Sequence, residues 1–137
     1  GTIDKYMGDC IMAFWNAPLD IEEQEKKATE AALEMRVALG ELNEIFKTEG
    51  IPEVRTGAGI NSGLCVVGNM GSNSRFDYSV LGDAVNLAAR LESACKEYET
   101  DLIISEYSMV EGYNYKFLDE VTVKGKSEPV KIYTITK

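Results

Sequence analysis

Few side chains of this chain could do chemistry, and none of them is a histidine. Asn86 and Arg90 stand four residues apart in a segment with helical periodicity, so an amide and a guanidinium would project from one helix face. Such a pair could bind an anionic substrate at the margin of a cleft or subunit interface, or it could be an ordinary solvated surface. Without histidine, Ser-His-Asp and Cys-His catalysis and His-ligated zinc are excluded. Carboxylates, hydroxyls, amides and cations must therefore carry any reaction.

Asp9 follows Gly8 in a strand-rich stretch, and Gly-Asp is a common turn dipeptide, so its carboxylate is expected at the tip of a hairpin. Rigid strands could hold it there for a hydrated Mg²⁺ ion, although turn chemistry alone would also explain it. Lys5 could read the edge of a base or be an exposed strand lysine. Lys124 and Lys126, in a glycine turn, could offer ammonium groups to phosphate oxygens or simply stay in water.

The composition places these residues in one globular domain that covers residues 1–137. A chain of 137 residues with 45% hydrophobic content can bury a core of its own. Its 14 Lys and Arg against 23 Asp and Glu give a net charge of −9, the wrong sign for nucleic-acid binding. No apolar run reaches the roughly 20 residues of a membrane-spanning helix, so we expect no direct membrane contact by this segment. Its cysteines, which we expect to be reduced thiols in or near the core and to indicate a cytoplasmic location, are Cys10, Cys65 and Cys95.

The elements that must position these side chains can be read from the hydrophobic periodicity. Residues 2–15 predict a β-hairpin around the Gly-Asp turn. Steps of three and four between apolar residues then predict one amphipathic helix over about 20–48, which Gly50 and Pro52 should end. The apolar stripe of that helix comprises Ala28, Ala31, Ala32, Met35, Leu39, Leu42 and Phe46.

Residues 54–60 predict a strand that turns at a glycine-rich loop and pairs with 64–68 as a second hairpin. After an extended segment at 75–81, a second helix should run to about Tyr98, with Asp83 as its N-cap. The remaining elements are a short buried strand at 102–104, a helical turn within 105–111 and two strands within 116–137. Because strands and helices interleave and several strands are joined by tight turns, we expect an α+β sandwich with a mostly antiparallel sheet and helices on one face.

Three segments, in this order, closely resemble the catalytic domain of class III adenylyl and guanylyl cyclases. They are Asp-Lys-Tyr-Met-Gly-Asp at 4–9, Phe-Asp-Tyr-Ser-Val-Leu-Gly-Asp-Ala-Val-Asn-Leu-Ala-Ala-Arg-Leu-Glu at 76–92 and Val-Lys-Gly-Lys at 123–126. The middle segment is the most specific, and together the three span nearly the whole chain. The resemblance implies a ferredoxin-like sandwich of the βαββαβ type, missing its first strand and helices because the chain starts too late.

The same resemblance implies an activity, the conversion of ATP to 3′,5′-cyclic AMP and pyrophosphate in a cleft between the two protomers of a homodimer. Asp9 matches the second of two aspartates that hold two Mg²⁺ ions, or Mn²⁺ in their place, to activate the ribose 3′-hydroxyl. Asn86 matches the asparagine that orients the ribose, and Arg90 the arginine that stabilises charge on the α-phosphate. Lys124 matches the lysine that grips the terminal phosphates.

Substrate choice would lie with Lys5 and Ser79, which match the two residues that read the purine from the other protomer. A lysine ammonium can donate to adenine N1, whereas the guanine edge would call for a carboxylate at that position. Lys5 therefore favours ATP. Ser79 stands where many adenylyl cyclases carry aspartate and another subgroup carries threonine, so the chain is similar to the hydroxyl subgroup.

Three other interpretations stay open at this point. A guanylyl cyclase is disfavoured by Lys5, and an unrelated ferredoxin-like interaction domain would make the three motifs a coincidence. A non-catalytic cyclase-like domain, which only dimerises or senses a nucleotide, should have lost some of the residues that are all filled here. Because the first metal aspartate is absent, we expect the isolated chain to bind nucleotide poorly and not to cyclise it, and we expect upstream sensor or membrane regions in the parent protein.

Overall fold

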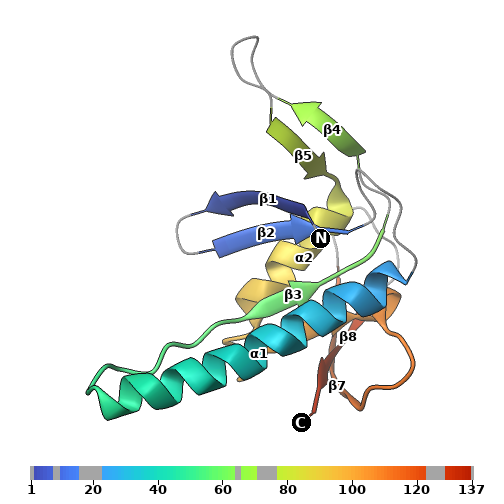
Figure 1. The fold of residues 1–137 in the computed structure, drawn as a ribbon. Coiled ribbons are helices and arrows are strands. Elements are labelled where there is room, and N and C mark those ends of the chain that lie inside the picture. Colours follow the sequence, from blue (N-terminus) through green and yellow to red (C-terminus); the bar gives the residue numbers. More distant parts are fainter. Residues whose placement is uncertain are drawn as a thin grey trace.

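In the computed structural model, strands and helices interleave along the chain (Figure 1). The elements, in chain order, are β1 (Thr2–Met7), β2 (Cys10–Phe14), α1 (Gln24–Thr48), β3 (Ala58–Ile60), β4 (Val66–Met70), β5 (Asp77–Leu81), α2 (Asp83–Ala94), β6 (Leu102–Ser105), a 3₁₀ turn (Glu106–Ser108), β7 (Tyr115–Val121) and β8 (Val130–Ile135). The structure describes residues 2–7, 10–15, 23–63, 66–70, 77–122 and 129–136, with side chains over 12–15, 23–63, 82–122 and 129–136.

The described strands form a 4-stranded sheet in the order β3-β6-β8-β7 and two 2-stranded sheets, β1-β2 and β4-β5. Only β3 and β6 run parallel within these sheets, and the other neighbours are antiparallel. The predicted α+β class and the mostly antiparallel pairing are therefore confirmed. So are the hairpin at the beginning of the chain and the two strands at its end.

Strand β6 is buried on both sides, and its two faces belong to two different cores. Ile103 packs with α2 residues such as Leu91, whereas Leu102 and Ile104 pack towards Leu33 of α1. Because successive side chains of a strand point to opposite faces, α1 and α2 must cover opposite faces of the 4-stranded sheet. The expectation of helices on one face only is wrong for α1 and α2.

Helix α1 ends where the glycine and proline signals predict. Gly50 adopts a positive φ of 74°, and the Ile51 N–H donates back to the Phe46 carbonyl at 2.8 Å, as in a glycine-terminated helix. In its middle, Arg36 donates to both carboxylate oxygens of Asp101, at 2.9 and 2.6 Å, and to a β8 carbonyl at 3.2 Å. This guanidinium ties α1 to the beginning of β6 and the end of β8.

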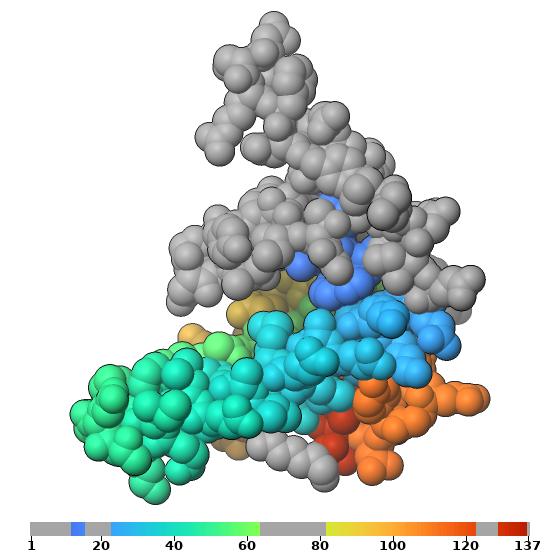
Figure 2. All heavy atoms as spheres, in the orientation of Figure 1, coloured from blue at the N-terminus to red at the C-terminus, as the bar shows by residue number. Residues whose placement is uncertain are grey.

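The apolar stripe of α1 is longer than the part of the sheet that it covers. Ala28 is buried, but Met35 and Leu42 are 58% and 43% exposed, and Ile45 beside them is 53% exposed. Figure 2 shows α1, coloured from light blue to green, crossing the visible face of the molecule, and Figure 1 shows its C-terminal end reaching beyond β3.

The pairing predicted between residues 54–60 and 64–68 is wrong. Only Ala58–Ile60 form a strand in the first range, and this strand pairs in parallel with β6. The second range contributes to β4, which pairs with β5 instead. The glycine-containing segment 61–63 is predicted to form a local turn. In the structure, the chain instead leaves one sheet there and continues to another.

Cys95 is a free thiol that is 3% exposed, which confirms the expectation of a reduced core cysteine at this position. The side chains of Cys10 and Cys65 lie outside the described part of the chain. No helix in the described part is both long and apolar enough to cross a bilayer.

Candidate functional site

Helix α2 carries the two residues singled out for the reaction, Asn86 and Arg90, and both side chains are exposed. On the same helix Leu87 and Leu91 are 2% and 1% exposed and belong to the core. The helix therefore presents the polar pair on an exposed face, beside a stripe of buried leucines. Both side chains are accessible to a ligand that approaches α2 from outside the core.

Two glycines bring α2 unusually close to β3. A Cβ on Gly59 would lie 2.5 Å from the Glu92 nitrogen and 2.9 Å from the Leu91 Cβ, and one on Gly57 would lie 2.9 Å from the Cys95 Cβ. Since these distances are too short for a real Cβ, the helix can occupy this position only over glycine. The sequence interpretation did not single out either residue, although glycines two apart in a strand mark one face without side chains.

The beginning of α2 is fixed by an amide rather than by a side-chain cap. Gly82, with φ at 148°, precedes the helix, so the prediction of Asp83 as the N-cap is wrong by one residue. Asn61 at the end of β3 donates to the Ala84 carbonyl at 3.0 Å and accepts a hydrogen bond from Ser105 of β6 at 2.5 Å. The first turn of α2 is thereby attached to the two parallel strands beneath it.

Arg90 is not free to move over the surface. Its Nη1 donates to the carbonyl oxygen of Thr122, just after β7, at 2.6 Å. A hollow of about 330 Å³ opens beside this contact. It is lined by Arg90, Leu91, Ala94, Glu97, Tyr98, Asp119, Glu120, Val121 and Thr122.

A second link joins the same two segments across the hollow. The Tyr98 hydroxyl, in the turn after α2, donates to Asp119 Oδ2 at 2.8 Å, and the Glu120 N–H donates to Asp119 Oδ1 at 2.8 Å. The hydrogen bond to Asp119 raises the pKa of Tyr98, because ionising the phenol would remove the donor beside a carboxylate. The Glu120 N–H, and after it the Tyr98 hydroxyl, lower the pKa of Asp119 by stabilising its charged form.

For the other predicted site residues, the structure describes only the backbone or does not describe the residue at all. Lys5 lies in β1, next to a register shift between Ile3 and Lys5, and Ser79 lies in β5 opposite Gly68. Strands β1 and β5 contact each other, so the segments that carry Lys5 and Ser79 are neighbours (Figure 1). Asp9 and Lys124 lie outside the described residues.

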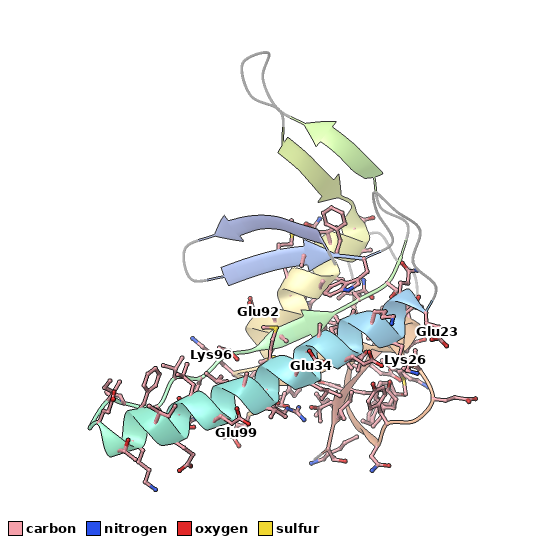
Figure 3. All side chains as sticks on the ribbon, viewed as in Figure 1. Glu23, Lys26, Glu34, Glu92, Lys96 and Glu99 are labelled. Carbon is pink, nitrogen blue, oxygen red and sulfur yellow. The ribbon has the colours of Figure 1, made fainter. Side chains whose placement is uncertain are left out.

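A second hollow, of about 580 Å³, lies at the beginning of α1 and involves none of the predicted residues. Glu23 and Lys26 line it, and Figure 3 shows both far from Glu92 and Lys96 of the α2 region. In the parts of the chain whose side chains are described, no three potential ligands gather closely enough to hold a metal ion. Asp9, the residue predicted to hold a metal ion, lies outside these parts.

Comparisons with known proteins agree on one family. The family model described as the adenylate and guanylate cyclase catalytic domain matches residues 4–137. The terminal-differentiation-specific adenylate cyclase of Dictyostelium discoideum is 38% identical over 98% of this chain, which corresponds to 6% of that protein. The chain spans no more than 28% of the length of the first curated relatives it matches.

Two solved structures are similar over almost the whole chain. The guanylyl cyclase Cya2 has a TM-score of 0.85 at 34% identity, covering 98% of this chain and 69% of its own. The adenylyl cyclase CyaB from P. aeruginosa has a TM-score of 0.84, also at 34% identity, covering 100% of this chain and 72% of its own.

Proposed function

The chain belongs to the family of adenylate and guanylate cyclase catalytic domains, and from this we propose that its protein converts ATP to 3′,5′-cyclic AMP and pyrophosphate. The observation that carries the proposal is the exposed pair of Asn86 and Arg90 on a helix held in place by glycine contacts. In a member of this family, the residue types of the pair and the fixed helix that carries it support a role in the reaction. The first curated relatives are named adenylate cyclases, which supports the same choice of reaction.

We assign to Arg90 the role of stabilising the negative charge that develops on the α-phosphate during the reaction. As the ribose 3′-oxygen attacks the α-phosphorus and the bond to pyrophosphate breaks, negative charge shifts among the phosphate oxygens. A guanidinium has five N–H donors, so Arg90 can keep its bond to the Thr122 carbonyl and still donate to an α-phosphate oxygen. Because that bond fixes its orientation beforehand, little reorganisation is needed in the transition state.

Asn86 is assigned to the ribose. Its position one helical turn before Arg90 lets an amide reach the sugar while the guanidinium reaches the adjacent phosphate. Lys124 is assigned to the terminal phosphates of ATP. Asp9 would hold Mg²⁺, which when bound neutralises triphosphate charge and lowers the pKa of the attacking hydroxyl.

The substrate is assigned from Lys5 and Ser79, on the neighbouring strands β1 and β5. An ammonium donates to adenine N1 and a hydroxyl can serve the exocyclic edge, whereas guanine presents a donor at N1 that would face the lysine unfavourably. A second candidate is cyclisation of GTP, since the guanylyl cyclase Cya2 resembles this chain as closely as the adenylyl cyclase CyaB does. Overall fold therefore does not separate the two substrates, and we rest the choice of ATP on Lys5.

One set of assays of the full-length protein tests the proposal. The wild type should form cyclic AMP from ATP faster than cyclic GMP from GTP. Arg90→Ala should lower turnover about 10²–10³-fold, the usual cost of one preorganised donor. Arg55→Ala, which removes an exposed arginine ahead of β3, should leave turnover unchanged.

The base assignment has its own variant. Lys5→Glu combined with Ser79→Cys should move the preference towards GTP, because the carboxylate would accept from guanine N1. An unchanged preference would contradict the assignment of these residues. A wild type that binds ATP but forms no cyclic nucleotide would favour a non-catalytic, nucleotide-sensing domain.

A further inference from the structure

The first turn of α2 has no side-chain cap of its own. The helix begins after Gly82, which has no side chain to accept a backbone N–H, and the Val85 and Asn86 N–H groups donate to the Gly82 carbonyl at 3.1 and 3.2 Å. The first N–H groups of a helix find no partners within it, so an uncapped first turn unwinds easily. Asn86 is the fourth residue of α2, and such unwinding would displace it.

A side chain from the segment after β3 holds this turn instead. Asn61 donates from its side-chain nitrogen to the Ala84 carbonyl at 3.0 Å, across 23 residues of sequence. Its side-chain oxygen accepts the hydroxyl of Ser105, a fully buried residue at the end of β6, at 2.5 Å. Because each end of the amide has a partner, rotating it would break both bonds, so the donor stays directed at α2. Gly63 lets the same turn approach closely, since a Cβ there would lie 2.9 Å from the Ala84 Cβ.

The rest of α2 is anchored separately. Gly59 and Gly57 admit the middle and the end of the helix against the β3 segment, and Arg90 is tied to the Thr122 carbonyl. Loss of the Asn61 bond should therefore release the first turn, while the second half of the helix stays in place. The two residues of α2 that are assigned to the reaction thus depend on different anchors.

We propose that Asn61 is a positioning residue for the reaction, which together with Ser105 holds the first turn of α2 so that Asn86 meets the ribose. This inference rests on the proposed function, and neither Asn61 nor Ser105 is required to touch the nucleotide. Its loss should lower kcat rather than raise KM, because a misplaced contact to the ribose disturbs the alignment of the attacking 3′-hydroxyl more than the binding of the whole nucleotide.

The test is a double-mutant cycle that measures cyclic AMP formation by the full-length protein. Asn61→Ala removes both hydrogen bonds of the amide and should lower kcat about tenfold with KM unchanged, since a misplacement of about 1 Å can cost up to about 10²-fold. In an Asn86→Ala background the same change should cost nothing more, because the side chain that it positions is gone. In an Arg90→Ala background it should again cost about tenfold.

Ser62→Ala is the matched control. Ser62 is the next residue in the chain, and its hydroxyl bonds the Ser108 hydroxyl at 2.7 Å, which joins the same segment to the 3₁₀ turn after β6 without involving α2. This variant should lower the urea midpoint of unfolding, as Asn61→Ala does, because each loses a partly buried hydrogen bond. Its kcat should match the wild type, which a purely structural role of Asn61 would not predict.

Ser105→Ala gives an independent measure, and it decides the matter if Asn61→Ala does not fold. It removes the hydroxyl that orients the amide, so kcat should fall, although less than in Asn61→Ala, and should not fall in the Asn86→Ala background. Equal losses with and without Asn86, an equal loss in Ser62→Ala, or no loss in either variant would overturn the positioning role of Asn61 and leave the wild type a cyclase. A wild type that forms no cyclic nucleotide would overturn the proposed function, and the positioning role with it.

Discussion

Cys95 shows how the contact between α2 and β3 determines the chemistry of one side chain. Its sulfur lies 3.5 Å from the Ala58 carbonyl and 3.6 Å from the Leu91 carbonyl, in a space from which water is excluded. Burial raises the pKa of the thiol to about 11, the charges of Glu92 and Asp101 add to the increase, and a backbone interaction at Ala58 opposes it. A thiol in this state is a weak nucleophile, because the thiolate is the reactive form.

The raised pKa of Cys95 predicts a loss of stability at alkaline pH. The folded thiol ionises near pH 11 and the unfolded one near pH 9.0, so between these values the unfolded state gives up a proton that the folded state keeps. The free energy of unfolding therefore falls as pH rises through this window, by at most about 3 kcal/mol for this group. Urea unfolding at pH 7.5, 9 and 10.5 measures it.

The control is Cys95→Ala, in which this part of the decline should be missing. The variant is expected to be less stable than the wild type at pH 7.5, because it leaves a small cavity. The difference between the two proteins should shrink as pH rises. If their stability curves ran parallel up to pH 10.5, the thiol would not be the group responsible.

Some residues of the candidate site could be predicted from the sequence, and others could not, for a physical reason. The four-residue spacing of Asn86 and Arg90 is a local property of a helix, so it can be read directly. Tyr98 and Asp119 give no such signal, because their contact spans 21 residues and depends on an extra residue in β7. The amino-acid sequence of β7 alone does not distinguish a bulged strand from a regular one.

At the scale of elements, features set by local sequence were predicted correctly, and features set by contacts between distant segments were not. Helix α1 has a periodic stripe and a glycine at its end, and its C-terminal boundary was predicted to the residue. The predicted partner strand of β3 was wrong, because β3 has just three residues and pairs with a strand more than 40 residues further along the chain. Turn signals indicate where the chain bends but carry no information on distant pairing, which hydrophobic burial of both faces of β6 decides here.

The close contact of α2 with β3 gives a prediction about Gly59. In Gly59→Ala the new methyl group would meet the backbone of α2, which cannot move aside as a flexible side chain would. We expect a loss of about 1–3 kcal/mol in the free energy of unfolding, measured by urea denaturation. Because α2 must shift to make room, turnover of ATP should fall as well.

Gly40→Ala is the control for the Gly59 variant. Gly40 lies within α1, and a Cβ there would meet nothing within 4 Å. Alanine favours the helical conformation over glycine, so this change should stabilise the protein by about 0.5–1 kcal/mol and leave turnover unchanged. A Gly59 variant as stable and as active as the wild type would show that α2 can dock without this glycine.

At the scale of the whole molecule, the net negative charge opposes the binding of an anionic substrate, so the positions of the cationic side chains matter. The chain carries a net charge of −9, and the proposed substrate is itself a polyanion. Binding therefore requires a local concentration of positive groups strong enough to overcome the average field. We propose that Lys5, Arg90 and Lys124 supply it at a site between two protomers, with Asp9 from one protomer and Arg90 from the other.

The shared site predicts that two inactive variants restore each other. A protomer with Asp9→Ala and a protomer with Arg90→Ala should each have very low turnover as homodimers. In the mixed dimer, one site combines both defects and the other combines the intact Arg90 of the first protomer with the intact Asp9 of the second. The two variants, carrying different affinity tags and purified together after co-expression, should therefore show about half of the wild-type turnover per dimer, since one of two equivalent sites is complete. If all groups of a site belonged to a single protomer, both sites of the mixed dimer would carry one defect, and the purified mixture would be as inactive as its parents.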